Sequence, residues 1–205
     1  ADVRELTGQT LTKVSVGPLD NNAYLLRCRS TGRRLLIDAA DDPSTLLALL
    51  ADGGLDRVVT THRHRDHWQA LAEVVSATGA GTAAGRDDAT AIPVPSDEPL
   101  ADGDRVMVGD VSLEVIGLVG HTPGSVALLY DDPDGHPHLF TGDSLFPGGP
   151  GKTTRPEDFT SLMDDLEGKV FGRFSDATWV YPGHGKDTTL GAERPSLPEW
   201  RRRGW

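Results

Sequence analysis

Residues 57–67 read RVVTTHRHRDH, so that a short β-branched run leads directly into a histidine-rich cluster. The run Arg57–Thr60 is typical of a β-strand, because valine and threonine fit a pleated, half-buried surface. Imidazole and carboxylate groups are ligands that zinc and similar cations prefer, and a loop after this strand is therefore predicted to wrap around metal. The alternative is a solvated polar loop, since arginine and aspartate are ordinary surface residues. Four candidate ligands lie within this cluster: His62, His64, Asp66 and His67.

The sequence around the cluster predicts strands followed by helices. Turn residues separate three short alternating runs that predict an antiparallel meander, at residues 11–17, 23–29 and 34–38. Apolar runs that stop at an Asp-Gly-Gly turn or at a glycine predict helices at 45–51 and 68–78.

The second half repeats this scheme. Strand pairs are predicted around Gly109-Asp110 and around an Asp/Pro/Gly-rich turn, at 106–108 with 111–118 and at 126–130 with 138–141. A helix at 156–170, a strand at 177–181 and a short helix at 195–203 complete the order. Two similar halves favour two sheets packed face to face with helices outside. We therefore expect an α/β protein, a four-layer αββα sandwich, with one domain over residues 1–205.

Composition excludes several classes of protein. With 20 Lys+Arg against 31 Asp+Glu, the net charge of −11 argues against broad binding to nucleic acid or anionic membranes. No run reaches the roughly 20 apolar residues of a membrane-spanning helix. The single cysteine, Cys28, excludes an internal disulfide and a multi-cysteine metal cage, and it is interpreted as a small core residue. Residues 1–10 are polar and acidic, unlike a signal peptide, so a cytoplasmic location is expected.

Three further motifs each follow a predicted strand and add one candidate ligand. They are GHTPGS with His121, TGDSLF with Asp143 and YPGHG with His184. Each is weak alone, because a loop histidine or an aspartate in an Asx turn is an equally good interpretation. The two remaining histidines, His136 and His138, lie near a turn rich in Asp, Pro and Gly and are expected to be exposed rather than ligands.

In this order the four motifs resemble those of the metallo-β-lactamase superfamily over nearly the whole chain. The resemblance implies the αββα metallo-β-lactamase fold and a centre with two divalent metal ions. Zinc is the expected metal, although iron or manganese occurs in relatives, and the absence of Glu from the first motif disfavours the redox di-iron branch. By this resemblance one ion is held by His62, His64 and His121 and the other by Asp66, His67 and His184, with Asp143 bridging them.

Within this superfamily, residues 141–152 (TGDSLFPGGPGK) are most similar to glyoxalase II, the hydroxyacylglutathione hydrolase. That family has the pattern GDxLFxxGxGK/R, whose basic residue grips a carboxylate of the thiol carrier, and Lys152 matches it. A solvated loop lysine is the alternative interpretation. The family often has an aromatic residue where this chain has Thr154, and it carries an appended helical domain that helps to bind glutathione. After the last motif this sequence has only a short tail that ends in ERPSLPEWRRRGW (residues 193–205), so the thiol carrier is left open.

We therefore expect a dinuclear zinc hydrolase that cleaves a small thioester or ester. Metal-bound hydroxide would attack the carbonyl carbon, with Asp66 orienting it. The metal site is expected to be a local positive spot that suits a small anionic substrate, whereas the motifs specify neither the substrate nor the oligomeric state. The alternatives are a β-lactamase, a lactonase, a mononuclear iron persulfide dioxygenase and a non-catalytic metal-binding protein. Phe146 disfavours the lactonase, since quorum-quenching relatives have a tyrosine after the bridging aspartate.

Overall fold

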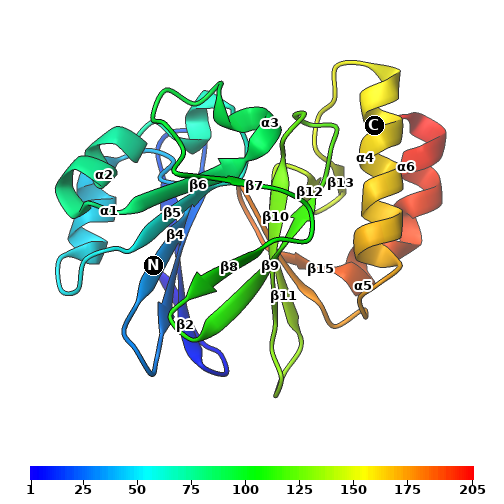
Figure 1. Cartoon of the computed structure of the whole chain (residues 1–205). Helices are drawn as coiled ribbons and strands as arrows, with labels where there is room; N and C mark the ends of the chain where they lie inside the picture. The colour runs from blue at the N-terminus through cyan, green and yellow to red at the C-terminus, as the bar shows by residue number, and fades with distance from the viewer.

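Two β-sheets face each other in the computed structural model, which describes all 205 residues, and helices cover their outer faces (Figure 1). The first sheet has seven strands in the order β1-β2-β3-β4-β5-β6-β7. In that order the strands span Asp2–Glu5, Gln9–Val16, Asn21–Cys28, Arg34–Ile37, Arg57–Thr60, Gly81–Gly85 and Glu98–Leu100.

The first sheet joins an antiparallel half to a parallel half. β1 to β4 form an antiparallel meander, and the meander predicted from the sequence is therefore confirmed for β2, β3 and β4. β4, β5, β6 and β7 run parallel, so each connection must cross back over the sheet. The carboxyl ends of β4, β5 and β6 consequently lie at one edge of the sheet. The crossovers contain α1 (Pro43–Leu50), α2 (Leu71–Thr78) and α3 (Arg86–Ala89), with a 3₁₀ turn, η1 (Arg65–His67), before α2.

The second sheet has six strands in the order β15-β14-β11-β10-β9-β8. β8 to β11 are antiparallel neighbours and β14 runs parallel to β11, so the chain leaves β11 and β14 at the same edge. These strands span Thr188–Thr189 (β15), Trp179–Pro182 (β14), Pro137–Gly142 (β11), Val126–Asp131 (β10), Val111–Gly117 (β9) and Arg105–Val108 (β8). The remaining elements are β12 (Leu145–Phe146), β13 (Gly149–Pro150), α4 (Pro156–Asp165), a π-helix η2 (Leu166–Phe171), α5 (Leu190–Glu193), η3 (Arg194–Ser196) and α6 (Leu197–Arg203).

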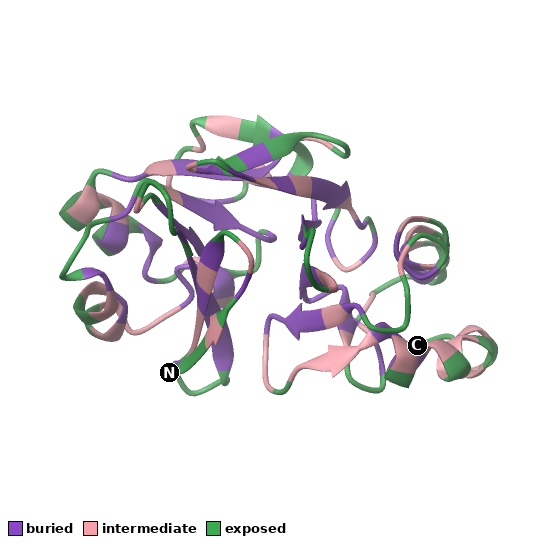
Figure 2. Ribbon diagram, turned by 90° about the horizontal axis from the view of Figure 1, so that it is seen from below, coloured by how far each residue is buried: buried purple, intermediate pink, exposed green.

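Three hydrophobic cores hold four layers together. Leu26 of β3 and Val115 of β9 belong to the core between the sheets. Leu46 of α1 packs with Val58 of β5 in a second core, and Leu162 of α4 belongs to a third core on the second sheet. Each of these side chains is fully buried, which contributes roughly 1.5–3 kcal/mol per side chain. Figure 2 shows buried strands at the centre and exposed outer faces on the helices. The predicted αββα sandwich is confirmed.

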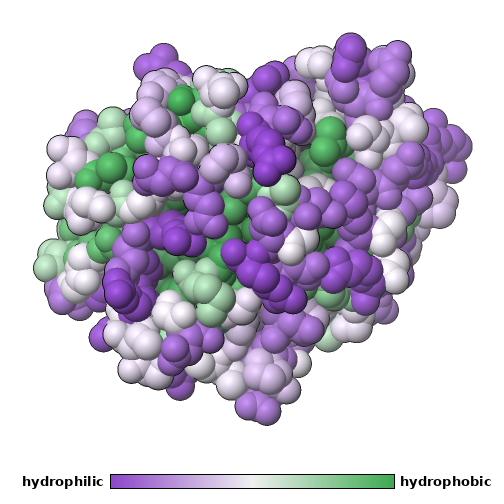
Figure 3. Space-filling model, viewed as in Figure 1, coloured by the Kyte–Doolittle hydropathy of each residue, from purple (hydrophilic) through white to green (hydrophobic).

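The outer surface is mainly hydrophilic in the view of Figure 3, with hydrophobic side chains visible in small separate areas. None of the helices combines the length and the apolar composition that crossing a membrane requires.

Several boundaries differ from the sequence-based expectations. The helix predicted at 156–170 is α4 followed by the π-helix η2, whose wider turn is closed by Gly172 N donating to Glu167 O. Gly168 within η2 weakens regular helix there, because glycine loses the most conformational freedom on folding. The helix predicted at 68–78 begins only at Leu71, since η1 precedes it. The region 85–99, where the sequence predicted no helix or strand, contains α3 and the start of β7.

The expectation that His138 is exposed is wrong. Alternate residues of a strand share a face, so His138 lies on the same inner face of β11 as Phe140 of the inter-sheet core. Its side chain is buried, its ring stacks on Tyr181, and its Nδ1 lies 2.8 Å from the Tyr181 hydroxyl. His136 is partly exposed.

The buried His138 gives the stability of the protein a defined pH dependence. Burial and the neighbouring His136 lower the pKa of His138 from 6.5 to about 4. As the pH falls from 6.5 to about 4, His138 is protonated in the unfolded chain but stays neutral in the folded one. The free energy of unfolding therefore decreases over this interval. The variant His138→Phe keeps an aromatic ring and cannot titrate. We expect its unfolding free energy to change less over this interval, with a slope smaller by at most about 1.4 kcal/mol per pH unit. Urea denaturation of both proteins across this range measures the difference, and identical slopes would contradict the prediction.

Candidate metal centre

All seven side chains that the sequence predicts as metal ligands come together at one edge of the sandwich. The loop after β5 carries four of them, and the β9–β10 connection carries His121. Asp143 follows β11 and His184 follows β14. Both sheets therefore contribute to the cluster, because the topology places the ends of these strands at a common edge.

The potential ligand atoms form three overlapping groups, and within each group they lie within 4.8 Å of one another. The overlap occurs at His62 and His67, so the groups form one continuous cluster. The groups are His62, His64 and His121; His62, His67 and Asp143; and Asp66, His67 and His184.

Asp143 lies at the centre of this arrangement. Its Oδ2 is 3.3 Å from His184 Nε2 and 3.4 Å from His67 Nε2. The same oxygen is 3.6 Å from His121 Nε2 and 3.7 Å from His62 Nε2. One carboxylate oxygen is thus within reach of histidines from both outer groups, which is the position that a bridging ligand occupies.

Backbone carbonyls fix the orientation of two of the histidines. His121 Nδ1 donates to Lys152 O at 2.6 Å, and His184 Nδ1 donates to Leu19 O at 2.9 Å. A carbonyl oxygen only accepts hydrogen bonds, so Nδ1 carries the hydrogen in both rings. When these rings are neutral, Nε2 therefore carries no hydrogen. Its lone pair points into the cluster, as metal coordination requires.

Asp38 plays the same role for His67, and sequence analysis missed it. This buried aspartate directly follows β4 and has a left-handed φ of 62°. Its Oδ2 lies 2.8 Å from His67 Nδ1, and its oxygens accept hydrogen bonds from the backbone N–H and the hydroxyl of Thr61. The signal was present in the sequence: a charged residue directly after the apolar run Leu35–Ile37 needs a buried partner.

Asn21 is a second residue that sequence analysis missed, because it lies among the turn residues between the strands predicted at 11–17 and 23–29. The side chain is buried at the start of β3, and its Nδ2 donates to the backbone oxygen of Asp66 at 2.9 Å. The same amide donates to Asp66 Oδ2 at 3.0 Å. Asn21 therefore holds both the backbone and the carboxylate of Asp66 in place.

The donor set fits divalent cations. His67 Nε2 and His184 Nε2 face each other at 3.2 Å, a contact that requires a proton or a metal cation between the two nitrogens. His62 Nε2 and Asp143 Oδ1 are buried without a hydrogen-bond partner. Buried polar atoms are almost always paired, and a coordinated cation would satisfy both of these atoms.

The base of the cluster stabilises both the positive charge of His67 and the negative charge of Asp143. Burial lowers the pKa of His67, but hydrogen bonds to Asp143 and Asp38 outweigh this effect and raise it to about 12. Burial raises the pKa of Asp143, but hydrogen bonds from His184 and His67 hold it well below its usual range. The carboxylates therefore stay ionised and stabilise positive charge between them.

The cluster is closed at its base and open at its rim. His62, His67 and Asp143 are buried, whereas His64 is exposed and His184 is partly exposed. A small molecule can therefore approach from the rim. The exposed side chain of Lys152 belongs to this side of the molecule, since its backbone oxygen accepts the His121 hydrogen bond.

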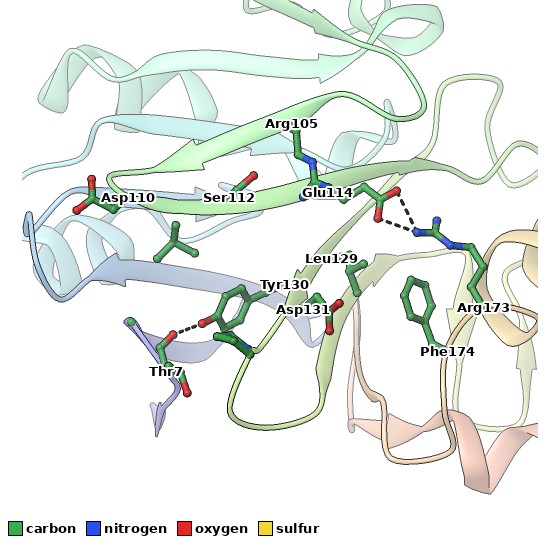
Figure 4. A pocket seen from close by; sticks show the side chains of 13 residues that line it. Thr7, Arg105, Asp110, Ser112, Glu114, Leu129, Tyr130, Asp131, Arg173 and Phe174 are labelled. Atoms are coloured by element: carbon green, nitrogen blue, oxygen red, sulfur yellow. Dashed lines mark hydrogen bonds and ion pairs between the residues drawn. The ribbon is translucent and has the colours of Figure 1, made fainter.

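A separate cavity of about 550 Å³ lies on the second sheet (Figure 4). Arg105, Glu114, Arg173 and Phe174 line it, and Arg173 donates to both carboxylate oxygens of Glu114 at 3.0 and 3.2 Å. None of the seven candidate ligands lines this cavity, so the cavity is separate from the cluster.

Comparisons with known proteins agree with this geometry. The profile of the metallo-beta-lactamase superfamily matches residues 16–184, which include all seven candidate ligands. A hydroxyacylglutathione hydrolase from Fuscovulum blasticum is 42% identical over 134 residues, which are 65% of this chain and 51% of that protein. The chain spans about half to three fifths of the length of the first curated relatives it matches, 51% and 62%.

Two solved structures extend the likeness to nearly the whole chain. TTHA1623 in a di-iron-bound form is 33% identical with a TM-score of 0.74, and the match covers 92% of this chain and 99% of that one. The BLEG-1 B3 metallo-beta-lactamase is 25% identical with a TM-score of 0.79, with coverage of 92% and 98%. Together with the αββα fold and the histidine cluster, these matches show that the chain belongs to the metallo-beta-lactamase superfamily.

Proposed function

We propose that this protein hydrolyses a small thioester or ester at a centre with two divalent metal ions, most simply zinc. The position of Asp143 Oδ2, within 3.7 Å of four histidine nitrogens, is the observation that carries this proposal. Asp143 would bridge the two ions. One ion would be held by His62, His64 and His121, and the other by Asp66, His67 and His184.

When bound, divalent cations supply Lewis acidity, which lowers the pKa of a water molecule and polarises a carbonyl oxygen. The residues of the chain orient the reactants around this chemistry. Because Asn21 fixes the rotamer of Asp66, the free lone pairs of that carboxylate can accept a hydrogen bond from the attacking water and aim it at the carbonyl carbon. An alkylthiolate is a good leaving group and needs little protonation, which agrees with the absence of a dedicated acid among the seven residues.

The similarity to hydroxyacylglutathione hydrolases supports a thioester as the substrate. The experiment that tests this proposal measures hydrolysis of a panel of thioesters, lactones and β-lactams, together with the metal content of the protein by elemental analysis. We expect thioester hydrolysis with about two metal equivalents per chain, and Asp66→Asn should lower kcat by about a hundredfold. If the protein holds less than one equivalent and Asp66→Asn leaves every rate unchanged, the hydrolase proposal fails.

Lys152 would bind an anionic group of the substrate. Its exposed side chain extends from the residue whose carbonyl holds His121, so a bound anion would lie beside the cluster. We expect Lys152→Gln to raise KM for an anionic thioester by about tenfold, or about 1.4 kcal/mol, with little change in kcat. Arg27→Gln removes the same charge from an exposed position on β3 and serves as the control. An unchanged KM in Lys152→Gln would assign this lysine to the solvated surface.

β-Lactam opening is the second candidate function. The similarity to the BLEG-1 B3 metallo-beta-lactamase, which this chain matches over 98% of that chain, favours it. Hydrolysis of nitrocefin with higher kcat/KM than any thioester of the panel would replace the first proposal with this one.

A further inference from the structure

A buried carboxylate outside the cluster ties two of its loops together. Asp88 lies in α3, directly after β6, and its side chain is fully buried. It belongs to none of the three groups of potential ligands. A buried carboxylate is costly unless hydrogen bonds satisfy it, so the partners of Asp88 indicate why the fold keeps it there.

Asp88 accepts three hydrogen bonds from the two loops of the first group of candidate ligands. Oδ2 accepts from the Arg63 backbone N–H at 2.9 Å and from the Thr122 hydroxyl at 2.6 Å. Oδ1 accepts from the Gly124 backbone N–H at 2.8 Å. Arg63 lies between His62 and His64 in the sequence, and Thr122 directly follows His121. Each of these two partners is therefore adjacent to a candidate ligand of one group, His62, His64 and His121.

The turn after His121 packs tightly against Asp88 and cannot drift away from it. A Cβ at Gly124 would overlap the backbone nitrogen of Asp88 and lie 2.9 Å from its Cβ. The contact between α3 and this turn consequently has no spare volume, and the hydrogen bonds fix a position that packing already restricts.

Asp88 and Asp38 support different, partly overlapping parts of the cluster. Asp38 hydrogen-bonds His67, a member of the other outer group, and also Thr61, which precedes His62. The side chain of Asp88 hydrogen-bonds only the loops that carry His62, His64 and His121. We propose that Asp88 is a positioning residue that sets the affinity of the His62, His64 and His121 site for its cation and leaves the Asp66, His67 and His184 site unchanged. This inference rests on the dinuclear centre proposed above.

Zinc titration of the metal-free full chain against a chromophoric chelator tests this division without measuring hydrolysis. The binding constants of both equivalents are compared in the wild type, Asp88→Asn, Asp38→Asn and the double variant. The amide of Asp88→Asn keeps only one acceptor oxygen and places its N–H₂ group against an N–H donor, so at least one of the two loops loses its hydrogen bond. We expect Asp88→Asn to weaken one equivalent by about 10–100-fold and to keep the other. Asp38→Asn loses hydrogen bonds beside both outer groups, so it and the double variant should weaken both equivalents.

Two further variants make the result interpretable. Asp132→Asn makes the same chemical change in a buried carboxylate that accepts hydrogen bonds from the Thr7 and Asp134 backbone N–H groups, in the β10–β11 hairpin away from the cluster. Both equivalents should bind to it as to the wild type. Thr122→Val removes one hydrogen bond to Asp88 and keeps the carboxylate, so it should weaken the same equivalent several-fold even where Asp88→Asn does not fold.

The outcomes separate this inference from the proposed function. If Asp88→Asn and Thr122→Val, folded by circular dichroism, bind both equivalents as the wild type does or lose both equally, Asp88 does not position one site. If the wild type binds fewer than two equivalents, the dinuclear centre itself is wrong and the inference falls with it.

Discussion

Asp143→Asn is expected to lower kcat/KM for the best substrate by about a thousandfold or more and to leave at most one tightly bound metal equivalent. One oxygen of Asp143 lies within 3.7 Å of four histidine nitrogens, and no other side chain reaches both outer groups in this way. The amide has no negative charge to hold two cations together, and its N–H₂ group repels cations. A thousandfold loss corresponds to about 4 kcal/mol of transition-state stabilisation.

Steady-state kinetics and elemental analysis of the purified variant measure both effects. Asp132→Asn is the matched control, since it changes a second buried carboxylate in the same way and lies outside the cluster. It should keep two equivalents and wild-type rates. An Asp143→Asn protein that retains two equivalents and at least a tenth of the activity would show that Asp143 does not bridge.

Gly183→Ala is expected to reduce hydrolysis by about a hundredfold to a thousandfold through a single added methyl group. A Cβ at this position would overlap Asp143 Oδ1 and lie 2.8 Å from His67 Cε1. The backbone cannot move aside freely, because Gly183 N donates to Gly142 O and Gly183 O accepts from Asn22 N, both at 2.8 Å. Either Asp143 or His67 must therefore leave its position, and misplacing a catalytic group by about 1 Å costs on the order of a hundredfold.

Activity and metal content of Gly183→Ala are compared with those of Gly168→Ala. The second variant adds the same methyl group in the π-helix η2, where it meets no atom within 4 Å, and it should behave as the wild type. Wild-type rates in Gly183→Ala would mean that the cluster tolerates rearrangement and does not need the geometry described above.

The candidate ligands could be found from sequence because each lies in a short motif within a loop that follows a strand. His62, His64, Asp66 and His67 form a dense local pattern, so their spacing alone indicates one loop around metal. The hairpin at Gly109-Asp110 was predictable for the same reason, since its turn residues and flanking valines are neighbours in the chain, and β8 does pair with β9.

The residues that orient the ligands could not be found in this way. Asp38 is 29 positions from His67, and Asn21 is 45 positions from Asp66, so the fold alone brings them together. β6 escaped prediction because Gly81–Gly85 consists of small residues with little strand propensity, and burial between its neighbours decides its conformation. The prediction that His138 is exposed was wrong for a related reason, since the strand face that this residue occupies depends on where β11 begins.

The contribution of both sheets to one cluster has a consequence for the lifetime of the folded chain. Cations held there would cross-link the two sheets, because the loop after β5 belongs to the first sheet and the loops after β9, β11 and β14 belong to the second. An unfolded chain has no such site, so bound metal would add about 2.7 kcal/mol per site to the free energy of unfolding when the free metal concentration is a hundred times Kd. If the proposed cations are bound, we therefore expect the abundance of this protein to fall under metal starvation, even at a constant rate of synthesis.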